Sequence, residues 1–199
     1  MIAGHAGAQD LMDRHTPLIL FLALVVAPSD VWPEMACGQG EEQRVERDPE
    51  LGLPAYSCFK HGVRNGRYLV PRTDNKVILL SVTYVNGLRS GTYMRRHRNG
   101  KVAATGGYAY GMRDGLWRFW NRKGVLLGHY TLSIGSGRYI RWWENGRKRE
   151  QGDLANGLRH GSWTFWRSDG SLESTGGYRK GQQHGVWRHS NRAGKANGT

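Results

Sequence analysis

The chain has 199 residues, among them 29 Gly and 8 Trp but only 6 Pro and 2 Cys, and its net charge is +13. This length suits one domain, and an aromatic content of 11% gives a core something to bury, which argues against disorder throughout. Two cysteines exclude a disulfide-dense scaffold and a four-thiolate zinc site, while the positive charge favours anionic partners.

The charge divides the chain near residue 58. Residues 1–58 carry three basic and nine acidic side chains, whereas residues 59–199 carry 26 basic and seven acidic ones. An acidic leader therefore precedes a strongly basic body.

The first segment has the pattern of a targeting sequence. An apolar run at 17–27 (PLILFLALVVA) follows Arg14. Eleven residues are too few to cross a bilayer as a helix, which takes about 20, but they suit the hydrophobic region of a signal peptide. Small residues favour cleavage after Ser29, so we expect a signal peptide at 1–29 and export to the periplasm, the cell envelope or the medium. The alternative, a buried core helix, finds no helical partner downstream.

Residues 30–58 are acidic and lack hydrophobic periodicity, so we expect an irregular segment. Cys37 and Cys58 flank it, and in an oxidising compartment they can pair as a disulfide, which would stabilise the fold by roughly 3 kcal/mol in the loop-entropy model. The alternative is two unpaired thiols without a role. Acylation of Cys37 as in a lipoprotein is disfavoured because Glu34 fits that motif poorly.

Residues 59–199 contain a tandem repeat of about 24 residues, the strongest signal in the chain. Each unit opens with a Gly that is followed two residues later by an aromatic residue. A second Gly comes nine residues after the opening one in every unit but the first, three times behind Asn or Asp. A Gly-x-x-x-Gly link closes most units. The opening glycines are Gly66, Gly91, Gly115, Gly137, Gly161 and Gly185.

Each unit predicts strand, turn and strand, because Asn-Gly and Asp-Gly supply the positive φ of tight hairpin turns. In the third unit the strands fall at 116–120 and 125–130, with the turn at 121–124. Stacked hairpins bury successive aromatics, so we expect an all-β fold: one elongated, twisted antiparallel sheet of ten or eleven strands. The expected structural stack consists of Tyr68, Tyr93, Trp117, Tyr139, Trp163 and Trp187.

The segments GLWRFWNRKG, GSWTFWRSDGSLESTGGYRKGQQHG and GVWRHSNRAG resemble the membrane occupation and recognition nexus (MORN) repeat, and more closely its bacterial variant in the YwqK family of toxin–antitoxin antitoxins. The resemblance covers residues 59–199. It implies a single elongated, twisted sheet that serves as a scaffold for a protein or lipid partner. The unit that opens at Gly115 is two residues short, which predicts a kink or register change near 130–137.

Basic residues mark the candidate contact surface. The middle residue of the link is Arg64, Arg89, Arg113 or Arg159, and since each unit spans two strands, this Arg should recur roughly every 10 Å along one edge. Such a ladder would attract an anionic ligand, whereas the alternative is that long basic side chains only solubilise an exposed sheet. Near the hairpin tips we add four further residues: Arg95, Arg96, Arg122 and Lys123.

A second row of tryptophans lies five residues after an opening Gly: Trp120, Trp142 and Trp166. In a regular strand this position has the opposite parity to the structural stack, so the row would be more exposed and able to stack on sugars, bases or a membrane interface. The alternative is that a β-bulge returns both sets to one face.

The residues favour a binding protein over an enzyme. His160 and His184 occupy equivalent repeat positions, and the carboxylates of the body form no acid–base pair. We expect no catalytic residue, metal or cofactor, and a monomer. Two functions remain: an exported scaffold that binds a protein partner, or a basic module that binds anionic lipid, glycan or another polyanion. Export argues against nucleic acid.

Overall fold

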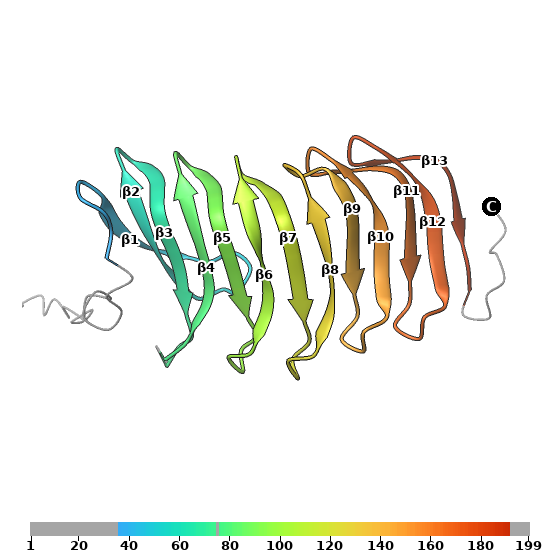
Figure 1. The fold of residues 1–199 in the computed structure, drawn as a ribbon, viewed down its shortest axis with the longest axis horizontal. Coiled ribbons are helices and arrows are strands. Elements are labelled where there is room, and N and C mark those ends of the chain that lie inside the picture. Colours follow the sequence, from blue (N-terminus) through green and yellow to red (C-terminus); the bar gives the residue numbers. More distant parts are fainter. Residues whose placement is uncertain (1–35, 75, 192–199) are drawn as a thin grey trace, which may run out of the picture.

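The structure, a computed structural model, describes residues 36–74 and 76–191, and in these residues every regular element is a β-strand (Figure 1). The all-β fold class is therefore confirmed, while the expected signal peptide at 1–29 lies outside the described residues. The strands are β1 (Glu42–Arg47), β2 (Pro54–Lys60), β3 (Val63–Pro71), β4 (Ile78–Val85), β5 (Leu88–Arg96), β6 (Val102–Ala109), β7 (Met112–Trp120), β8 (Leu126–Leu132), β9 (Gly137–Trp142), β10 (Lys148–Ala155), β11 (Leu158–Trp166), β12 (Leu172–Arg179) and β13 (Gln182–His189).

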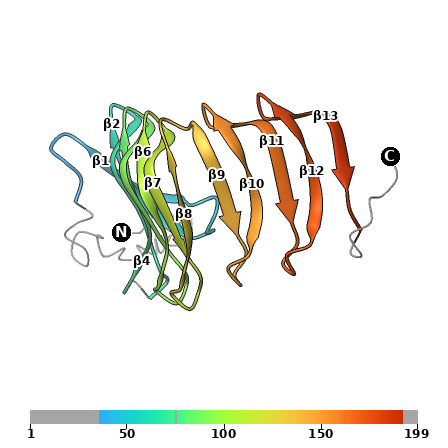
Figure 2. The ribbon, with the colours of Figure 1, turned by 45° about the vertical axis from the view of Figure 1, so that its right-hand side comes forward.

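Consecutive strands pair antiparallel in two sheets, β1 to β8 and β9 to β13. The prediction of one continuous sheet is wrong in this respect, because the hydrogen-bond ladder is interrupted between β8 and β9, where Ser133 and Ser136 form an isolated bridge. Strand β9 still lies beside β8 in both views (Figures 1 and 2). The break falls within 130–137. The repeat unit that opens at Gly115 is two residues shorter than most of the others, which leaves too little chain here to continue the ladder.

The leader is not irregular, contrary to the expectation from its composition. It forms β1 and most of β2, which pair from Glu42↔Phe59 to Arg47↔Pro54. Strand β1 lies at the edge of its sheet, and charged side chains are typical of an exposed edge, where they oppose pairing with another chain. The described residues thus contain thirteen strands, against the ten or eleven expected. A disulfide between Cys37 and Cys58 ties the start of the leader to β2.

The Gly-x-x-x-Gly links are two-residue turns followed at once by the next strand. At the turn before β5, Asn86 and Gly87 have φ of +49° and +81°, and two positive φ values are the mark of a type I′ hairpin turn. The first turn position also has positive φ at His61, Tyr110, Ile134, Asn156 and Lys180. Because the strands begin directly after these turns, the link arginines lie inside strands.

The turns at the other end of the strands use their Asn differently from the prediction. Gly100 has a φ of +86°, whereas Asn99 is not among the residues with positive φ. The Asn99 side chain accepts a hydrogen bond from the Lys101 N–H (3.1 Å) and donates one to the Arg122 carbonyl in the next turn (2.8 Å). The Asn therefore joins neighbouring turns, and the Gly alone supplies the positive φ.

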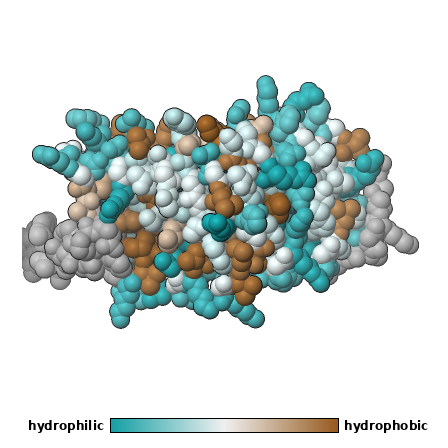
Figure 3. Space-filling model, in the orientation of Figure 1, coloured by the Kyte–Doolittle hydropathy of each residue, from teal (hydrophilic) through white to brown (hydrophobic). Residues whose placement is uncertain are grey.

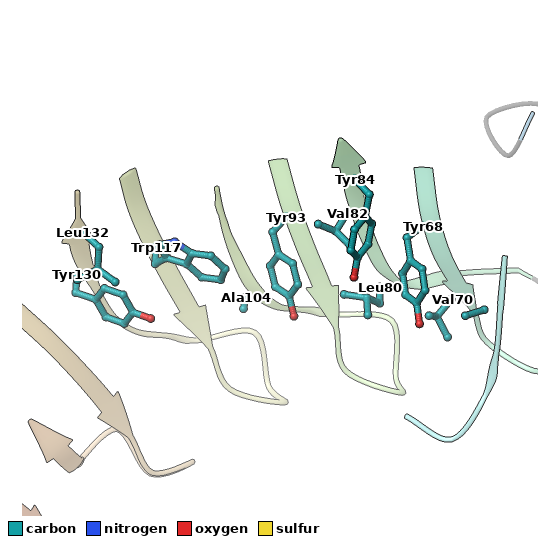
Figure 4. Packing of buried hydrophobic residues seen from close by; sticks show 11 residues of the cluster. Tyr68, Val70, Leu80, Val82, Tyr84, Tyr93, Ala104, Trp117, Tyr130 and Leu132 are labelled. Atoms are coloured by element: carbon teal, nitrogen blue, oxygen red, sulfur yellow. The ribbon is translucent and has the colours of Figure 1, made fainter. Parts of the chain in front are cut away.

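The core is a row of side chains on one face of the sheets. Figure 4 labels ten of them, which extend from the successive strands β3 to β8. Of the expected stack, Trp117 and Trp163 are fully buried, Tyr68 and Tyr93 are buried, and Tyr139 and Trp187 are half-buried. Neighbouring rings touch along this row, for example Tyr93 and Trp117 at 5.1 Å between centroids.

Candidate functional site

The link arginines lie on the same face as the aromatic core. The Arg113 guanidinium stands 4.5 Å from the ring centre of Trp117, and Arg159 stands at the same distance from Trp163. Arg89 lies 5.4 Å from the ring centre of Tyr108 in the same way. Cations at this distance are attracted to the ring faces, so the arginines are held on the aromatic row.

Arg64, the first of the series, lies 4.9 Å from the Tyr84 ring. It also forms an ion pair with Glu46 of β1. Arg159, the last, pairs with Glu150 at 2.6 Å. A carboxylate thus fits beside a guanidinium that rests on an aromatic ring.

The two middle arginines differ. The Arg89 guanidinium donates to the hydroxyls of Tyr84 and Tyr108, both at 3.2 Å, and Arg113 donates to the Tyr130 hydroxyl. Within residues 36–74 and 76–191, no carboxylate forms an ion pair with either guanidinium. Arg89 and Arg113 therefore present positive charge whose partners are neutral hydroxyl groups.

The pKa values of Arg113 and Tyr130 are both shifted by burial and by each other. Burial by itself would lower the pKa of Arg113, but the hydroxyls of Tyr130, Tyr108 and Tyr139 raise it above its ordinary value. Burial raises the pKa of Tyr130, which Arg113 opposes only in part. The pair is therefore a fixed cation beside a protonated hydroxyl at neutral pH.

Three adjoining depressions run along this face from β5 to β12, and we call them together the groove. The first, of about 510 Å³, lies between Glu50 of the leader and Trp142. The second, of about 440 Å³, includes Arg89 and Arg159, and it shares Arg113 with the first. The third, of about 570 Å³, continues toward β12. Figure 3 shows the opposite face of the sheets, because the β1–β2 loop lies behind the strands in this orientation (Figure 1), and that face carries small hydrophobic groups separated by hydrophilic ones.

The loop between β1 and β2 covers the aromatic face next to the groove. Figure 1 shows this loop crossing β3, β4 and β5. Leu51 and Leu53 pack against the core, and the Tyr68 hydroxyl donates to the Asp48 carboxylate (2.8 Å). Glu50 forms an ion pair with Arg95. The chain's own acidic segment therefore occupies the start of the aromatic face.

Of the other predicted basic residues, Arg95 lines the first depression beside Arg113, whereas Arg96, Arg122 and Lys123 line none of the three depressions. Arg96 donates to the Gly100 carbonyl of its own turn (3.1 Å). The Arg122 side chain is 78% exposed, and its nearest carboxylate, Glu144, is 3.7 Å away. Lys123 is exposed in the same turn. Arg122 and Lys123 therefore form a second, solvated basic surface, to which the partly buried Arg96 does not belong.

The second tryptophan row is half-buried. The Trp142 ring lies 5.8 Å from Phe119 of the core, and Trp120 lines the first depression. The Trp166 carbonyl accepts a hydrogen bond from the Trp143 indole (2.9 Å). Strict alternation predicts greater exposure, but the strand register shifts between Phe119 and Trp120, which interrupts the alternation at this position.

Two kinds of groove residue were missed in the sequence. Glu150 is 4% exposed and binds both Arg141 (3.2 Å) and Arg159. The tyrosines that hold Arg89 and Arg113 lie on the strands that follow each hairpin tip. Tyr108 and Tyr178 each come two residues after a glycine, Gly106 and Gly176, and this regular position in the sequence indicates that such tyrosines belong to the repeated arrangement.

Among the described residues, Cys37, Cys58 and Glu41 lie close enough together to be considered as metal ligands. The two sulfurs are joined as a disulfide, so neither is a free thiolate that could bind a metal. The described residues also contain no helix with the length and apolarity needed to cross a membrane. In comparisons with known proteins, no protein-family model and no curated protein matches the chain.

Proposed function

We propose that this protein is an exported, non-catalytic scaffold for protein–protein interaction that grips its partner along the groove. The observation that carries the proposal is the row of arginines resting on aromatic rings from β5 to β12. Aromatic and Arg side chains are the residues that dominate binding energy at protein interfaces. Beyond the β1–β2 loop, no other described segment packs over this face.

We also propose that the chain is a MORN-type repeat protein of the YwqK-like bacterial variant, which the sequence of residues 59–199 resembles. The recurrence of a positive φ at corresponding turn positions from His61 to Lys180 supports a tandem unit. A toxin-like partner is the kind that this resemblance implies. The apolar run at 17–27 and the Cys37–Cys58 disulfide support export.

Site-specific photocrosslinking in cells that make the chain tests the scaffold proposal. A photoreactive amino acid is placed at Leu127, which lines the first depression, and in a second variant at Arg118, which is exposed on strand β7. We expect discrete protein adducts from position 127 and not from position 118. Equal adducts from both positions, or none from position 127, would contradict the proposal.

The exposed hairpin tips favour a second function, binding of anionic lipid or another polyanion. Arg122 and Lys123 are solvated, and exposed charges act through electrostatics that salt screens within about 10 Å. Retention on anionic vesicles or heparin should then fall sharply between low and high salt, and it should fall further in an Arg122→Gln, Lys123→Gln variant. Retention that is independent of salt excludes this function.

A further inference from the structure

We propose that the segment the groove accepts is acidic, extended and leucine-containing, with its carboxylates on Arg89 and Arg113. This proposal rests on the scaffold function proposed above and gives the chemistry of its partner.

The leader shows which chemistry the aromatic face accepts. The segment from Asp48 to Leu53 (DPELGL) presents carboxylates to Tyr68 and Arg95, while its two leucines pack against the core. The partners of the two carboxylates are a tyrosine and an arginine, and tyrosines and arginines also line the groove farther along. The aromatic face thus already holds an acidic, leucine-containing segment of the same chain.

The groove begins beside Glu50 of the leader. Glu50 lines the first depression together with Tyr93, Arg113 and Trp117. A partner segment lying beyond Glu50 would therefore meet the same combination of aromatic floor and guanidinium groups that the leader meets before it.

The charge of the groove is complementary to such a segment. The second depression is lined by four arginines and one carboxylate, Glu150, which Arg141 and Arg159 already bind. The guanidinium groups of Arg89 and Arg113 have only tyrosine hydroxyls as hydrogen-bond partners in the described chain. A carboxylate can join each of them as Glu46 joins Arg64, because a guanidinium offers five N–H donors.

Peptide binding to the full-length chain tests the proposal. The probe is a fluorescent peptide with the sequence of residues 46–53, ERDPELGL, followed by fluorescence polarisation. Two control peptides replace either the three acidic residues by their amides or both leucines by alanine. Loss of charge-assisted hydrogen bonds should weaken binding of the amide peptide by about tenfold or more. The alanine peptide should also bind more weakly.

Variants place the peptide on the groove. An Arg89→Gln, Arg113→Gln chain should bind the acidic peptide about tenfold less tightly. Arg118→Gln removes an exposed Arg from the same strand as Arg113 and should leave binding unchanged. An Arg89→Lys, Arg113→Lys chain keeps the charge and should bind with intermediate affinity, and urea unfolding of each variant checks that it is folded.

The proposal is overturned if the amide peptide binds as tightly as the acidic one, if the double Gln variant binds normally, or if Arg118→Gln is equally damaging. It is also overturned if the Arg89→Gln, Arg113→Gln chain no longer binds phosphatidylglycerol vesicles but still binds the peptide. Failure of the peptide with successful crosslinking from position 127 would reject only the acidic chemistry. Failure of the crosslinking would reject the scaffold function.

Discussion

The indole ring of Trp117 lies directly over Gly106 of the neighbouring strand. A Cβ built on Gly106 would stand 2.2 Å from the ring, which is far inside van der Waals contact. Gly152 and Gly176 face Trp163 and Trp187 in the same way, each at 2.3 Å. At these three positions the absence of a side chain leaves the space in which the tryptophan of the next strand lies.

Gly106→Ala should destabilise the fold by about 1–3 kcal/mol, because the Trp117 ring is 1% exposed and cannot move aside. Gly176→Ala is the matched control and should cost less, since Trp187 is half-buried on the last described strand. Urea unfolding gives both free energies. In a double-mutant cycle, Gly106→Ala should cost less in a Trp117→Leu background, and strict additivity would show that the ring is not the cause.

The turn before β7 predicts a stabilising substitution. Tyr110 has a φ of +52° and is 74% exposed, and a left-handed backbone costs a bulky residue roughly 1–2 kcal/mol. Asn occupies the equivalent position at Asn86 and Asn156. Tyr110→Asn should therefore raise the free energy of unfolding by about 0.5–1 kcal/mol.

The reciprocal change, Asn156→Tyr, is the control and should lower the unfolding free energy by a similar amount. Thermal or urea unfolding measures both variants. If Tyr110→Asn destabilises the protein, the Tyr110 ring makes a contribution that outweighs its backbone strain.

The sequence predicted the strands and the stack well because Gly and aromatic residues report directly on turns and burial. The third unit illustrates this: strands were expected at 116–120 and 125–130 and lie at Met112–Trp120 and Leu126–Leu132. Strand β1 escaped prediction because its charged residues (EQRVER) show no apolar alternation, and only its pairing with β2 makes it a strand.

The groove was predictable in its residues but not in its arrangement. The sequence pattern predicts the link arginines as a ladder along one edge that attracts an anionic ligand, with the links connecting successive hairpins. The type I′ turns take up only two residues, so Arg113 is the second residue of β7 and lies over Trp117. Glu150 gave no signal, since its role depends on Arg159, which comes from the neighbouring strand.

Glu150 should be important for stability although its ion pairs lie in the groove. It is 4% exposed and bridges Arg141 and Arg159, so its removal leaves two guanidinium groups facing each other. Breaking a buried ion pair costs about 3–5 kcal/mol, and we expect about 2 kcal/mol for Glu150→Gln because the Arg141 side chain is 49% exposed.

Glu144→Gln is the matched control, because the Glu144 side chain is 58% exposed and lies 3.7 Å from Arg122. Surface pairs of this kind contribute about 0–1 kcal/mol, so this variant should be nearly neutral. Urea unfolding at neutral pH compares the two. Equal effects would mean that burial of Glu150 adds nothing to the strength of its pairs.

The buried tyrosines predict a loss of stability at high pH. Burial raises the pKa of Tyr93 from 10.0 to about 12, which Arg95 opposes only in part. A tyrosine with a raised pKa in the folded state stabilises the fold fully below pH 10, and this contribution is lost as the pH rises from 10 to 12. Stability to urea should therefore fall over this interval.

In Tyr93→Phe, which cannot ionise at this position, the decline in stability should be shallower. The control is Tyr110→Phe, whose ring is 74% exposed, and its stability should decline like that of the parent. An unchanged slope in Tyr93→Phe would show that this hydroxyl does not sense the fold.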